Sequence, residues 1–410
     1  MKFLYNLLLF KASILLPILA LFNKKIKLFV NGRKQTFNKL ATINKTDKVI
    51  WFHAASLGEF EQGRPIIEEL KQQYKSHKIV VTFFSPSGYE IRKNYPLADV
   101  ICYLPLDTKT NVKKFINQIH PDIAIMIKYE FWPNLLSELK KQNINTILIS
   151  GIFRKKQSFF KWYGSFMREK LTAFNYFFVQ NKVSQDLLSS INIQNTTIAG
   201  DTRFDRVSDI LHQDNSLNFI AEFTQNKHIL VAGSTWKEDE DLIVDYINNH
   251  ALADEKFIIA PHNINPKEIK ELQKSINKKT ILFSEKETGN LSENQVFIID
   301  TIGLLTKIYS YATVAYVGGG LKTGLHNILE PATFGLPILF GPNYKKFGEA
   351  EDLIEQGGAV SIKSYKEFFE QSALLMNPMQ LKERSQICES YIHQNQGATE
   401  MVVKHLKSYL

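Results

Sequence analysis

The sequence predicts an α/β protein with two Rossmann-like, doubly wound domains that face a central cleft, preceded by an apolar N-terminal helix. Continuous apolar runs recur along the chain and alternate with helical stretches, as expected for parallel strands that are buried on both faces. A polar stretch interrupts this alternation around residues 205–226. The length of 410 residues exceeds that of one typical core and fits two domains of roughly 150–200 residues each.

The N-terminal segment, residues 1–28, is predicted to anchor the chain to a membrane. Residues 3–22 are almost wholly apolar and about long enough to cross a bilayer. Lys11 lies near the midpoint, where a lysine costs roughly 2.5–3.5 kcal/mol on insertion scales. A basic cluster follows at Lys24, Lys25 and Lys27, which suits anionic headgroups on the cytoplasmic side. The segment either spans the bilayer or lies in its interface, and a cleaved signal peptide and a buried terminal helix are the alternatives.

The first domain, residues 29–205, starts where the alternation of strands and helices begins. Its predicted strands are residues 49–52, 79–84, 100–104, 123–127, 146–149 and 176–179. Residues 206–226 are expected to link it to a second domain, residues 227–395. The strands predicted there are residues 228–232, 257–260, 280–283, 296–299, 314–317, 338–340 and 359–362. A last helix within residues 396–410 can pack back on the first domain.

The composition narrows the classes of function. The formal net charge is +9, which favours anionic partners such as nucleic acid, lipid or a phosphorylated substrate. No zinc finger, basic helix or RNP-like pattern accompanies this charge, so nucleic acid is not expected as a partner. The two cysteines, Cys102 and Cys388, indicate neither a disulfide framework nor a cysteine metal site. HExxH and Walker motifs are also missing, so we expect neither a metal nor a cofactor.

Three charged residues of the first domain are candidate catalytic residues. Glu59 follows the first strand near the start of a helix, where a carboxylate can act as a general base toward an acceptor hydroxyl, although Ser56 and Glu59 also fit a plain capping box. Glu130 follows a buried strand, at the edge of the sheet where ligands bind, or simply caps the next helix. Arg203 ends the domain and either offers a fixed cation to a phosphate or is an ordinary surface arginine.

Glycine and polar residues follow several strands of the second domain and predict a nucleotide site. Gly318, Gly319 and Gly320 lead into a helix, a geometry that lets backbone N–H groups approach a phosphate, although such turns are also ordinary packing solutions. One turn into that helix, Glu330 can accept two hydrogen bonds from a ribose diol. Other turns of this kind are Gly233-Ser234-Thr235, Pro261-His262 and residues 300–304. The first strand-to-helix turn of the chain lacks GxGxxG, which disfavours a dehydrogenase.

Several motifs together resemble the family of 3-deoxy-D-manno-octulosonic acid (Kdo) transferases of lipopolysaccharide assembly. After the apolar N-terminus they are HAASLGEFEQ, YEFWPN, GDTRFD, AGSTW, DTIGLL and GLHNILEPATFGLPILFGP. The resemblance covers nearly the whole chain, and the first and last of these motifs are long and specific. It implies a GT-B type glycosyltransferase at the cytoplasmic face of the inner membrane. Such an enzyme transfers Kdo from CMP-Kdo to the lipid A precursor lipid IVA, inverting the anomeric centre without a metal.

The resemblance also implies a role for each candidate residue. Glu59 is the expected proton acceptor, and Glu130 and Arg203 are expected to stabilise the transition state. The implied CMP contacts are Pro261, His262, Ile302, Gly303, Leu304, Asn327, Ile328, Leu329 and Glu330, with Glu330 on the ribose. Residues 154–156, Arg-Lys-Lys, suit the phosphates of the acceptor and the headgroups around it.

The sequence departs from the family's pattern at three places. Many relatives have a lysine where Arg203 stands, so the charge is kept but its geometry is not. Leu304 stands where relatives often have glutamate, which leaves only backbone contact to the cytidine. Lys128 and Tyr129 replace acidic and threonine residues before Glu130.

Two other functions stay open at this point. One is a transferase that uses a UDP-sugar, and the other is a membrane-tethered scaffold that binds partners without catalysis. Epimerases and some dehydrogenases share the two-domain pattern as well. Neither the number of Kdo units added nor the oligomeric state follows from the sequence.

Overall fold

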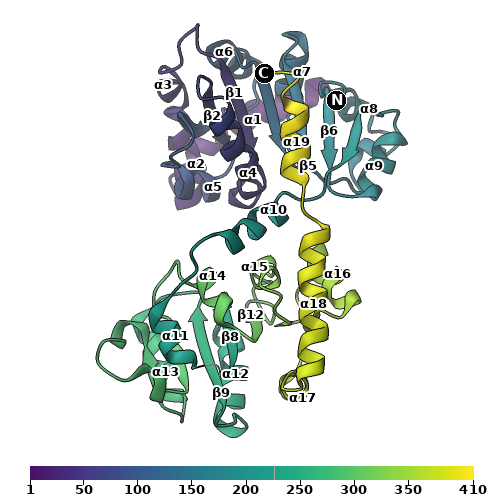
Figure 1. The fold of residues 1–410 in the computed structure, drawn as a ribbon. Helices are drawn as coiled ribbons and strands as arrows, with labels where there is room; N and C mark the ends of the chain where they lie inside the picture. Colours follow the sequence, from purple (N-terminus) through teal and green to yellow (C-terminus); the bar gives the residue numbers. More distant parts are fainter. Residues whose placement is uncertain (226) are drawn as a thin grey trace. The chain divides into compact units, whose positions relative to one another are not determined.

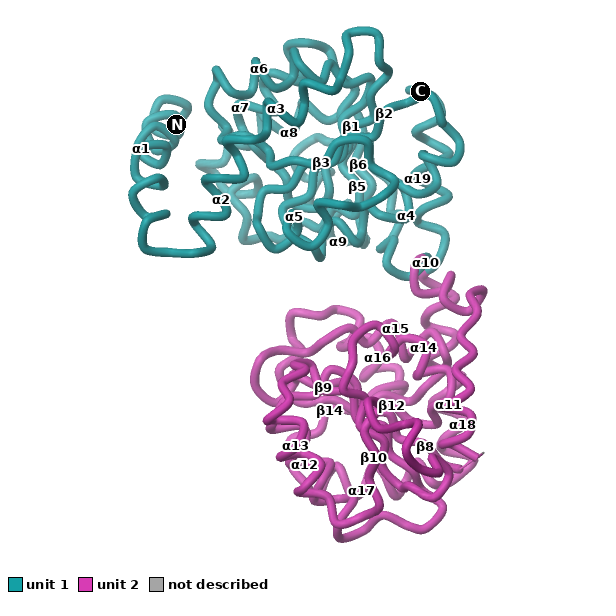
Figure 2. The backbone as a smooth tube through the Cα atoms, turned by 90° about the vertical axis from the view of Figure 1, so that its left-hand side faces the viewer, with its two compact units in different colours: residues 1–205, 396–410 teal, residues 206–395 magenta. Residues whose placement is uncertain are grey.

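The structure is a computed structural model, which describes residues 1–225 and 227–410. The chain forms two compact units (Figure 1 and Figure 2), with residues 1–205 and 396–410 in unit 1 and residues 206–395 in unit 2. Each unit is built on one parallel sheet of seven strands, with apolar clusters on both of its faces. The expectation of two parallel-sheet α/β domains is therefore confirmed.

The sheet of unit 1 has the strand order β3-β2-β1-β4-β5-β6-β7. Its strands are β1 (Val49–Ala54), β2 (Lys78–Phe83), β3 (Val100–Tyr103), β4 (Ile123–Ile127), β5 (Asn145–Gly151), β6 (Tyr176–Val179) and β7 (Thr196–Ile198). The chain leaves β1 for β2 on one side and reaches β4 on the other. The loops that follow β1 and β4 therefore flank the crevice where doubly wound sheets bind their ligands.

Helices cover both faces of this sheet. They are α3 (Thr36–Leu40), α4 (Leu57–Gln73), α5 (Pro86–Arg92), α6 (Lys109–Ile119), α7 (Pro133–Lys141), α8 (Ser165–Leu171), α9 (Lys182–Ser189) and α19 (Ala398–Leu406), with a 3₁₀ turn η1 at Ser158–Phe160. Trp51 packs in the cluster on one face and Phe52 in the cluster on the other, because successive residues of a strand point to opposite faces.

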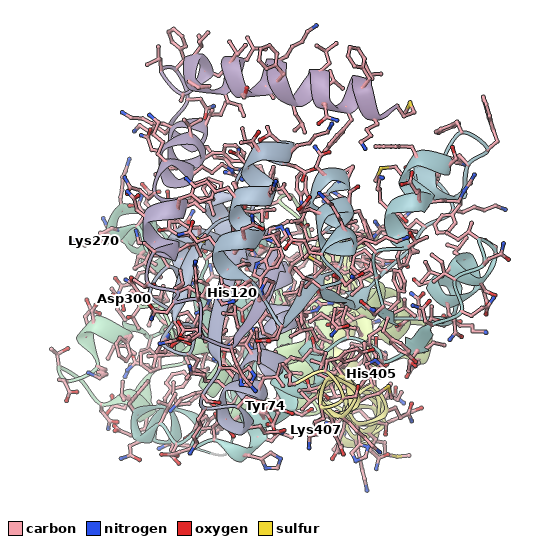
Figure 3. All side chains as sticks on the ribbon, turned by 90° about the horizontal axis from the view of Figure 1, so that it is seen from above. Tyr74, His120, Lys270, Asp300, His405 and Lys407 are labelled. Atoms are coloured by element: carbon pink, nitrogen blue, oxygen red, sulfur yellow. The ribbon has the colours of Figure 1, made fainter. Side chains whose placement is uncertain are left out.

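The C-terminal helix α19 belongs to unit 1. Val402, Val403 and Leu406 are buried in the same apolar cluster as residues of α4. The imidazole of His405, labelled in Figure 3, lies 4.1 Å from the ring of Tyr176. The start of α19 is fixed by Asp205, whose carboxylate accepts hydrogen bonds from the backbone N–H groups of residues 397 and 399, both at 2.6 Å. The last residues of the chain thus complete the core of the unit that contains the first ones.

Two N-terminal helices, α1 (Lys2–Leu19) and α2 (Lys24–Lys34), lie along the side of unit 1 (Figure 2). By length and composition α1 is able to cross a membrane. None of its residues is buried, so the alternative of a buried terminal helix is wrong.

The sheet of unit 2 has the order β10-β11-β9-β8-β12-β13-β14. Its strands are β8 (His228–Thr235), β9 (Glu255–Pro261), β10 (Thr280–Leu282), β11 (Val296–Ile298), β12 (Val314–Val317), β13 (Ile338–Phe340) and β14 (Ala359–Ser361). Its α-helices are α11 (Asn218–Thr224), α12 (Lys237–Asn249), α13 (Pro266–Ser275), α14 (Leu305–Ile308), α15 (Leu329–Thr333), α16 (Gly348–Gln356), α17 (Tyr365–Leu375) and α18 (Pro378–Gln394). Its 3₁₀ turns are η2 (Asp209–His212), η3 (Phe283–Glu285), η4 (Leu291–Glu293) and η5 (Tyr309–Tyr311).

The segment predicted as a linker, residues 206–226, is more ordered than its polar composition indicates. It holds the end of α10 (Arg203–Ser208), then η2 and α11, and residue 226 lies outside the described residues. Ile220 and Phe223 of α11 are buried in an apolar cluster of unit 2. From residue 218 the chain is therefore part of unit 2 rather than a connection between domains.

Candidate functional site

In unit 1, Glu59 lies on the first turn of α4, directly after β1. Its carboxylate is partly buried and accepts a hydrogen bond from the hydroxyl of Ser56. The Ser56 side chain accepts no hydrogen bond from the first amides of the helix, so the capping box is not formed. The start of a helix carries a partial positive charge, which favours an ionised carboxylate there. Glu59 is thus a negatively charged group at the edge of the sheet where ligands bind.

Glu130 is nearly fully buried after β4, and two aromatic residues lie against it. The indole N–H of Trp132 donates to Oε2 of Glu130 at 2.7 Å. Nε2 of His53, at the end of β1, lies 2.7 Å from the same oxygen, and the two side chains are 0% and 4% exposed. β1 and β4 are adjacent in the sheet, which brings His53 and Glu130 together from opposite sides of the crevice.

The two ring nitrogens of His53 have different partners. Nδ1 is 3.0 Å from the carbonyl oxygen of Thr82, which can only accept, so Nδ1 carries a proton. Nε2 lies 2.7 Å from the Glu130 carboxylate but has no hydrogen-bond partner of suitable geometry among the described residues. The two side chains are therefore in close polar contact, which is an ion pair only when the imidazole is protonated.

Arg203 is fixed by a buried acid rather than lying loose on the surface. Its Nε and Nη2 lie 2.9 and 2.8 Å from Oδ2 of Asp201. The same carboxylate oxygen accepts from the amide of Gln62 at 2.9 Å. Gln62 is on α4, one turn after Glu59, so the segments GEFEQ and GDTRFD are connected in unit 1.

Tyr129 lies close to both Glu59 and Arg154. Burial and the charge of Glu59 raise the pKa of the Tyr129 phenol, whereas the charge of Arg154 lowers it. The guanidinium carbon of Arg154 is 5.5 Å from the centre of the Tyr129 ring. An exposed cation therefore lies next to a tyrosine that neighbours the predicted base.

In unit 2, three aromatic rings stack at the carboxyl edge of the sheet. The ring of His262 lies 4.8 Å from that of Trp236 and 4.5 Å from that of His326. The indole N–H of Trp236 donates to Nε2 of His326 at 3.1 Å. Burial and the neighbouring His262 lower the pKa of His326. The predicted turn Pro261-His262 is thus brought next to the start of the segment that carries residues 327–330.

Glu330 joins two of the predicted CMP segments. One of its carboxylate oxygens accepts from the hydroxyl of Thr306 at 2.7 Å, and the other accepts from the amide of Asn327 at 2.9 Å. Thr306 follows the turn at residues 302–304, in which Ile302 is 81% exposed. Gly303 has a φ of +91°, and a Cβ added there would meet no atom within 4 Å. Ile328 and Leu329 are buried beneath Glu330 and offer only backbone atoms to a ligand.

The glycine turn at residues 318–320 is closely packed within the protein. The N–H of Gly318 donates to the carbonyl oxygen of Gly233 at 2.9 Å, and that of Gly319 donates to the buried carboxylate of Asp239 at 2.8 Å. A Cβ at Gly320 would overlap the backbone of Gly341. These two N–H groups are therefore used inside the fold, and the role of this turn as a phosphate loop stays a prediction.

The turn at residues 233–235 is also engaged internally. Ser234 adopts a φ of +55°, and the hydroxyl of Thr235 donates to Glu240 at 3.0 Å. A cavity of about 540 Å³ lies beside this turn. Its charged lining residues are Lys237, Glu238, Glu240, Asp241, Glu268, Glu271 and Lys322. Five carboxylates against two lysines disfavour a phosphate, so we do not place the donor's phosphate there.

No cluster of three or more His, Cys, Asp or Glu side chains with the spacing of a metal site occurs in the part of the chain that the structure describes. The expectation of a metal-free and cofactor-free site stays a prediction.

Sequence reasoning assigned no role to several residues that the structure places in these networks. They are His53, Asp201, Trp236, Thr306 and His326. All of them lie in or next to quoted motifs and close to the carboxyl ends of strands, which is the signal that could have found them.

The comparisons with known proteins point to one family. The model of 3-deoxy-D-manno-octulosonic-acid transferase (kdotransferase) matches residues 31–206. The 3-deoxy-D-manno-octulosonic acid transferase of Rickettsia bellii is 27% identical over 359 residues, 85% of this chain and 85% of that protein. The transferase of the same name from Haemophilus influenzae is 27% identical over 380 residues, 88% of this chain and 87% of that protein.

Among solved structures, UDP-GlcNAc 2-epimerase from Neisseria meningitidis has a similar fold. Its TM-score is 0.61 at 16% sequence identity, covering 88% of this chain and 100% of that one. One fold of this kind serves several reactions, so this likeness does not identify the chemistry. The family model matches residues 31–206, less than half of the chain, and relatives at 27% identity span most of it, so the chain is similar to Kdo transferases.

Proposed function

We propose that this chain transfers Kdo from CMP-Kdo to lipid IVA with inversion of the anomeric centre, as a step of lipopolysaccharide synthesis at the cytoplasmic face of the inner membrane. Similarity to Kdo transferases supports the sugar and the pathway. The observation that carries the proposal is the position of Glu59, a partly buried carboxylate at the edge of the sheet where β1 ends.

In the proposed reaction, Glu59 takes the proton from a hydroxyl of the acceptor. The oxygen of that hydroxyl bonds to the anomeric carbon of Kdo while the bond from this carbon to the phosphate oxygen breaks, and CMP leaves with the electron pair. A single displacement inverts the anomeric centre. General base catalysis of this kind contributes about 10²–10⁴-fold in rate. Glu130, paired with His53, and Arg203, held by Asp201, are the proposed stabilising groups, because both are fixed in position by buried partners.

The arrangement within unit 2 supports donor binding there. Thr306 and Asn327 fix the carboxylate of Glu330, which is proposed to accept from the ribose diol of CMP. The exposed ring of His262 is proposed to contact the donor from the adjacent turn. The exposed turn at residues 302–304 offers backbone groups to the cytosine.

The acceptor is a phosphorylated lipid, which fits two features of unit 1. Arg154 lies beside Tyr129, which neighbours Glu59, and is proposed to contact a phosphate of the acceptor. The apolar helix α1 and the lysines that follow it are proposed to hold unit 1 at the anionic membrane surface.

The proposal is tested by incubating the purified full chain with CMP-Kdo and tetra-acylated lipid IVA and measuring the mass of the lipid product. We expect addition of Kdo by the native chain and its loss in E59A, with CMP binding retained. E69A is the matched control, since Glu69 lies on the same helix and, among the residues that the structure describes, its side chain forms a hydrogen bond with Gln73 alone. Transfer by E59A at the native rate would show that Glu59 is not the base. Displacement of the donor by UDP more readily than by CMP would favour a UDP-sugar instead.

A further inference from the structure

Unit 1 contains an apolar cavity that the proposed reaction does not explain. Its volume is about 520 Å³, within the roughly 300–1,000 Å³ of sites that bind small molecules. Leu9 and Leu16 of α1 and Phe29 of α2 form one wall. Phe84, Leu106 and Trp132, from the loops that follow β2, β3 and β4, form the other.

The wall formed by α1 contacts unit 1 along most of its length. Close to the start of the helix, the hydroxyl of Tyr5 donates to Asp107 at 2.7 Å, and the side chain of Asn6 accepts from Asn134 at 2.9 Å. Towards the end of the helix, Leu16 lines the same cavity as Phe84.

These attachments determine how α1 can meet a membrane. A helix of 18 residues is roughly 27 Å long, and a spanning orientation would carry one end across the bilayer, away from unit 1. Because α1 contacts unit 1 from Tyr5 to Leu16, its orientation fits the plane of the membrane interface rather than a span of the bilayer.

The two sides of α1 differ in what they contact. Its half-buried residues recur at helical spacing and face unit 1, namely Tyr5, Asn6, Leu9, Ala12, Ser13 and Leu16. Figure 3 shows side chains projecting from α1 both toward unit 1 and away from it. On the outer side, large apolar residues are exposed, among them Phe3 at 81% and Phe10 at 61%. Lys11 is exposed on this helix as well, so its charge would lie at the level of the headgroups. Large exposed apolar surface of this kind marks a site of contact with a membrane or a protein.

Charge at the edge of the cavity indicates the kind of lipid. Lys25 lines the cavity, and Lys24 and Lys27 lie beside it on the exposed first turn of α2. Ammonium groups at the level of the headgroups attract anionic lipids. At the inner end, Trp132 lines the cavity and also donates a hydrogen bond to Glu130. A chain bound in this cavity therefore ends next to the predicted site of transfer.

From these observations we propose that the cavity binds one acyl chain of the lipid acceptor while its sugar lies at Glu59 and Glu130. The proposal rests on the proposed function, because it takes the acceptor to be an acylated, phosphorylated sugar. Binding one chain inside the protein would lift the sugar from the membrane surface toward the carboxyl edge of the sheet. It would also make the enzyme select acylated acceptors.

Two tryptophan variants of the full chain test the proposal by kinetics. A12W places a large ring in the cavity, because Ala12 lines it. L8W adds the same ring on the outer side, where Leu8 is 57% exposed. We expect A12W to raise the KM for lipid IVA at least tenfold while the KM for CMP-Kdo is unchanged. The ratio of kcat/KM for lipid IVA to kcat/KM for the deacylated sugar should fall as well. L8W should retain the native values. Equal KM values for lipid IVA in the two variants would overturn the proposal.

A labelling experiment tests binding without relying on turnover. Myristic acid that carries a diazirine near its end is irradiated with the detergent-solubilised full chain, and the labelled residues are mapped by mass spectrometry. We expect labels on cavity residues such as Leu9 and Phe84 that tetra-acylated lipid IVA prevents and its deacylated form does not. Labels confined to the outer side of α1 would refute the cavity as an acyl site. If labelling is competed but no Kdo is transferred, the proposed function fails and the lipid site stands.

Discussion

Replacing Glu130 with glutamine should separate its part in folding from its part in transfer. In the native protein Nε2 of His53 and the indole N–H of Trp132 both lie 2.7 Å from the same carboxylate oxygen, Oε2. A glutamine can place at this position either its oxygen, which accepts from Trp132, or its NH₂ group, which donates to a neutral His53, but not both. We therefore expect E130Q to lower the free energy of unfolding of unit 1 by about 1–3 kcal/mol, the cost of leaving one buried polar group unsatisfied.

Variants that remove one partner should behave differently. In E130A the buried His53 loses its neighbour, and in H53A the carboxylate of Glu130 stays buried without the imidazole. The two side chains are 4% and 0% exposed, so water cannot replace the missing group. Removal of one member of a buried pair costs about 3–5 kcal/mol, and we expect both variants to lie in that range.

The assay exploits the distribution of tryptophans. Three of the four tryptophans, Trp51, Trp132 and Trp162, lie in unit 1, so fluorescence in a W236F background reports the unfolding of that unit alone in denaturant. The same E130Q protein should lose at least about 100-fold in kcat if the charge of the pair stabilises the transition state. If E130Q is destabilised as much as E130A, the hydrogen bond that the glutamine retains does not stabilise unit 1, and this reasoning is wrong. If E130Q transfers Kdo at the native rate, Glu130 has no electrostatic role.

Three further outcomes follow from the structure. Burial raises the pKa of Cys102 and Cys388 to about 12, so neither thiol should react with Ellman's reagent at pH 8 in the native protein. Both thiols should react after unfolding in guanidinium. Reaction in the native protein would contradict their burial. The pKa of His326 is lowered, so the unfolded chain binds a proton at this residue at a higher pH than the folded chain does, and stability should fall as the pH drops below about 6.5. An NMR titration should show that this pKa rises when CMP binds. An unchanged pKa would mean that the phosphate of CMP binds elsewhere. G319A should lower the free energy of unfolding of unit 2 by more than about 2 kcal/mol, because φ is +86° at this residue and a Cβ would overlap a carbonyl oxygen. G324A should cost about 1 kcal/mol, because φ is +110° but a Cβ would meet no neighbouring atom. Equal losses in the thermal unfolding of the two variants would contradict the packing argument.

Much of the fold could be predicted because parallel strands that are buried on both faces are uninterrupted apolar runs. The predicted run at residues 123–127 is β4 itself, and Glu130 stands just beyond it. β7 could not be predicted in this way, since Thr196–Ile198 is partly exposed at the edge of the sheet and starts with two threonines. The predicted start of the second domain lies after α11, because the polar residues of this helix indicate a linker. Its side chains Phe223 and Ile220 are nevertheless buried in unit 2.

The positions of the candidate site residues were more predictable than their partners. Loops after strands are visible in the sequence, and Glu59 and Glu330 were placed from them. The contact of His53 with Glu130 depends on β1 lying next to β4, an order that the sequence does not specify. The bond between Gln62 and Asp201 joins residues 139 positions apart. Such long-range partners follow from topology, which local patterns do not contain.

The crossing of the last helix back to unit 1 bears on how the protein is made. Residues 1–205 leave the ribosome first, yet the cluster that covers α4 is complete only when Val402, Val403 and Leu406 have been synthesised. Until then, a strip of apolar surface on the older half of the nascent chain stays open to water or to a chaperone. Nonsense mutations that remove α19 should therefore destabilise the sheet of residues 49–198, which is synthesised long before this helix.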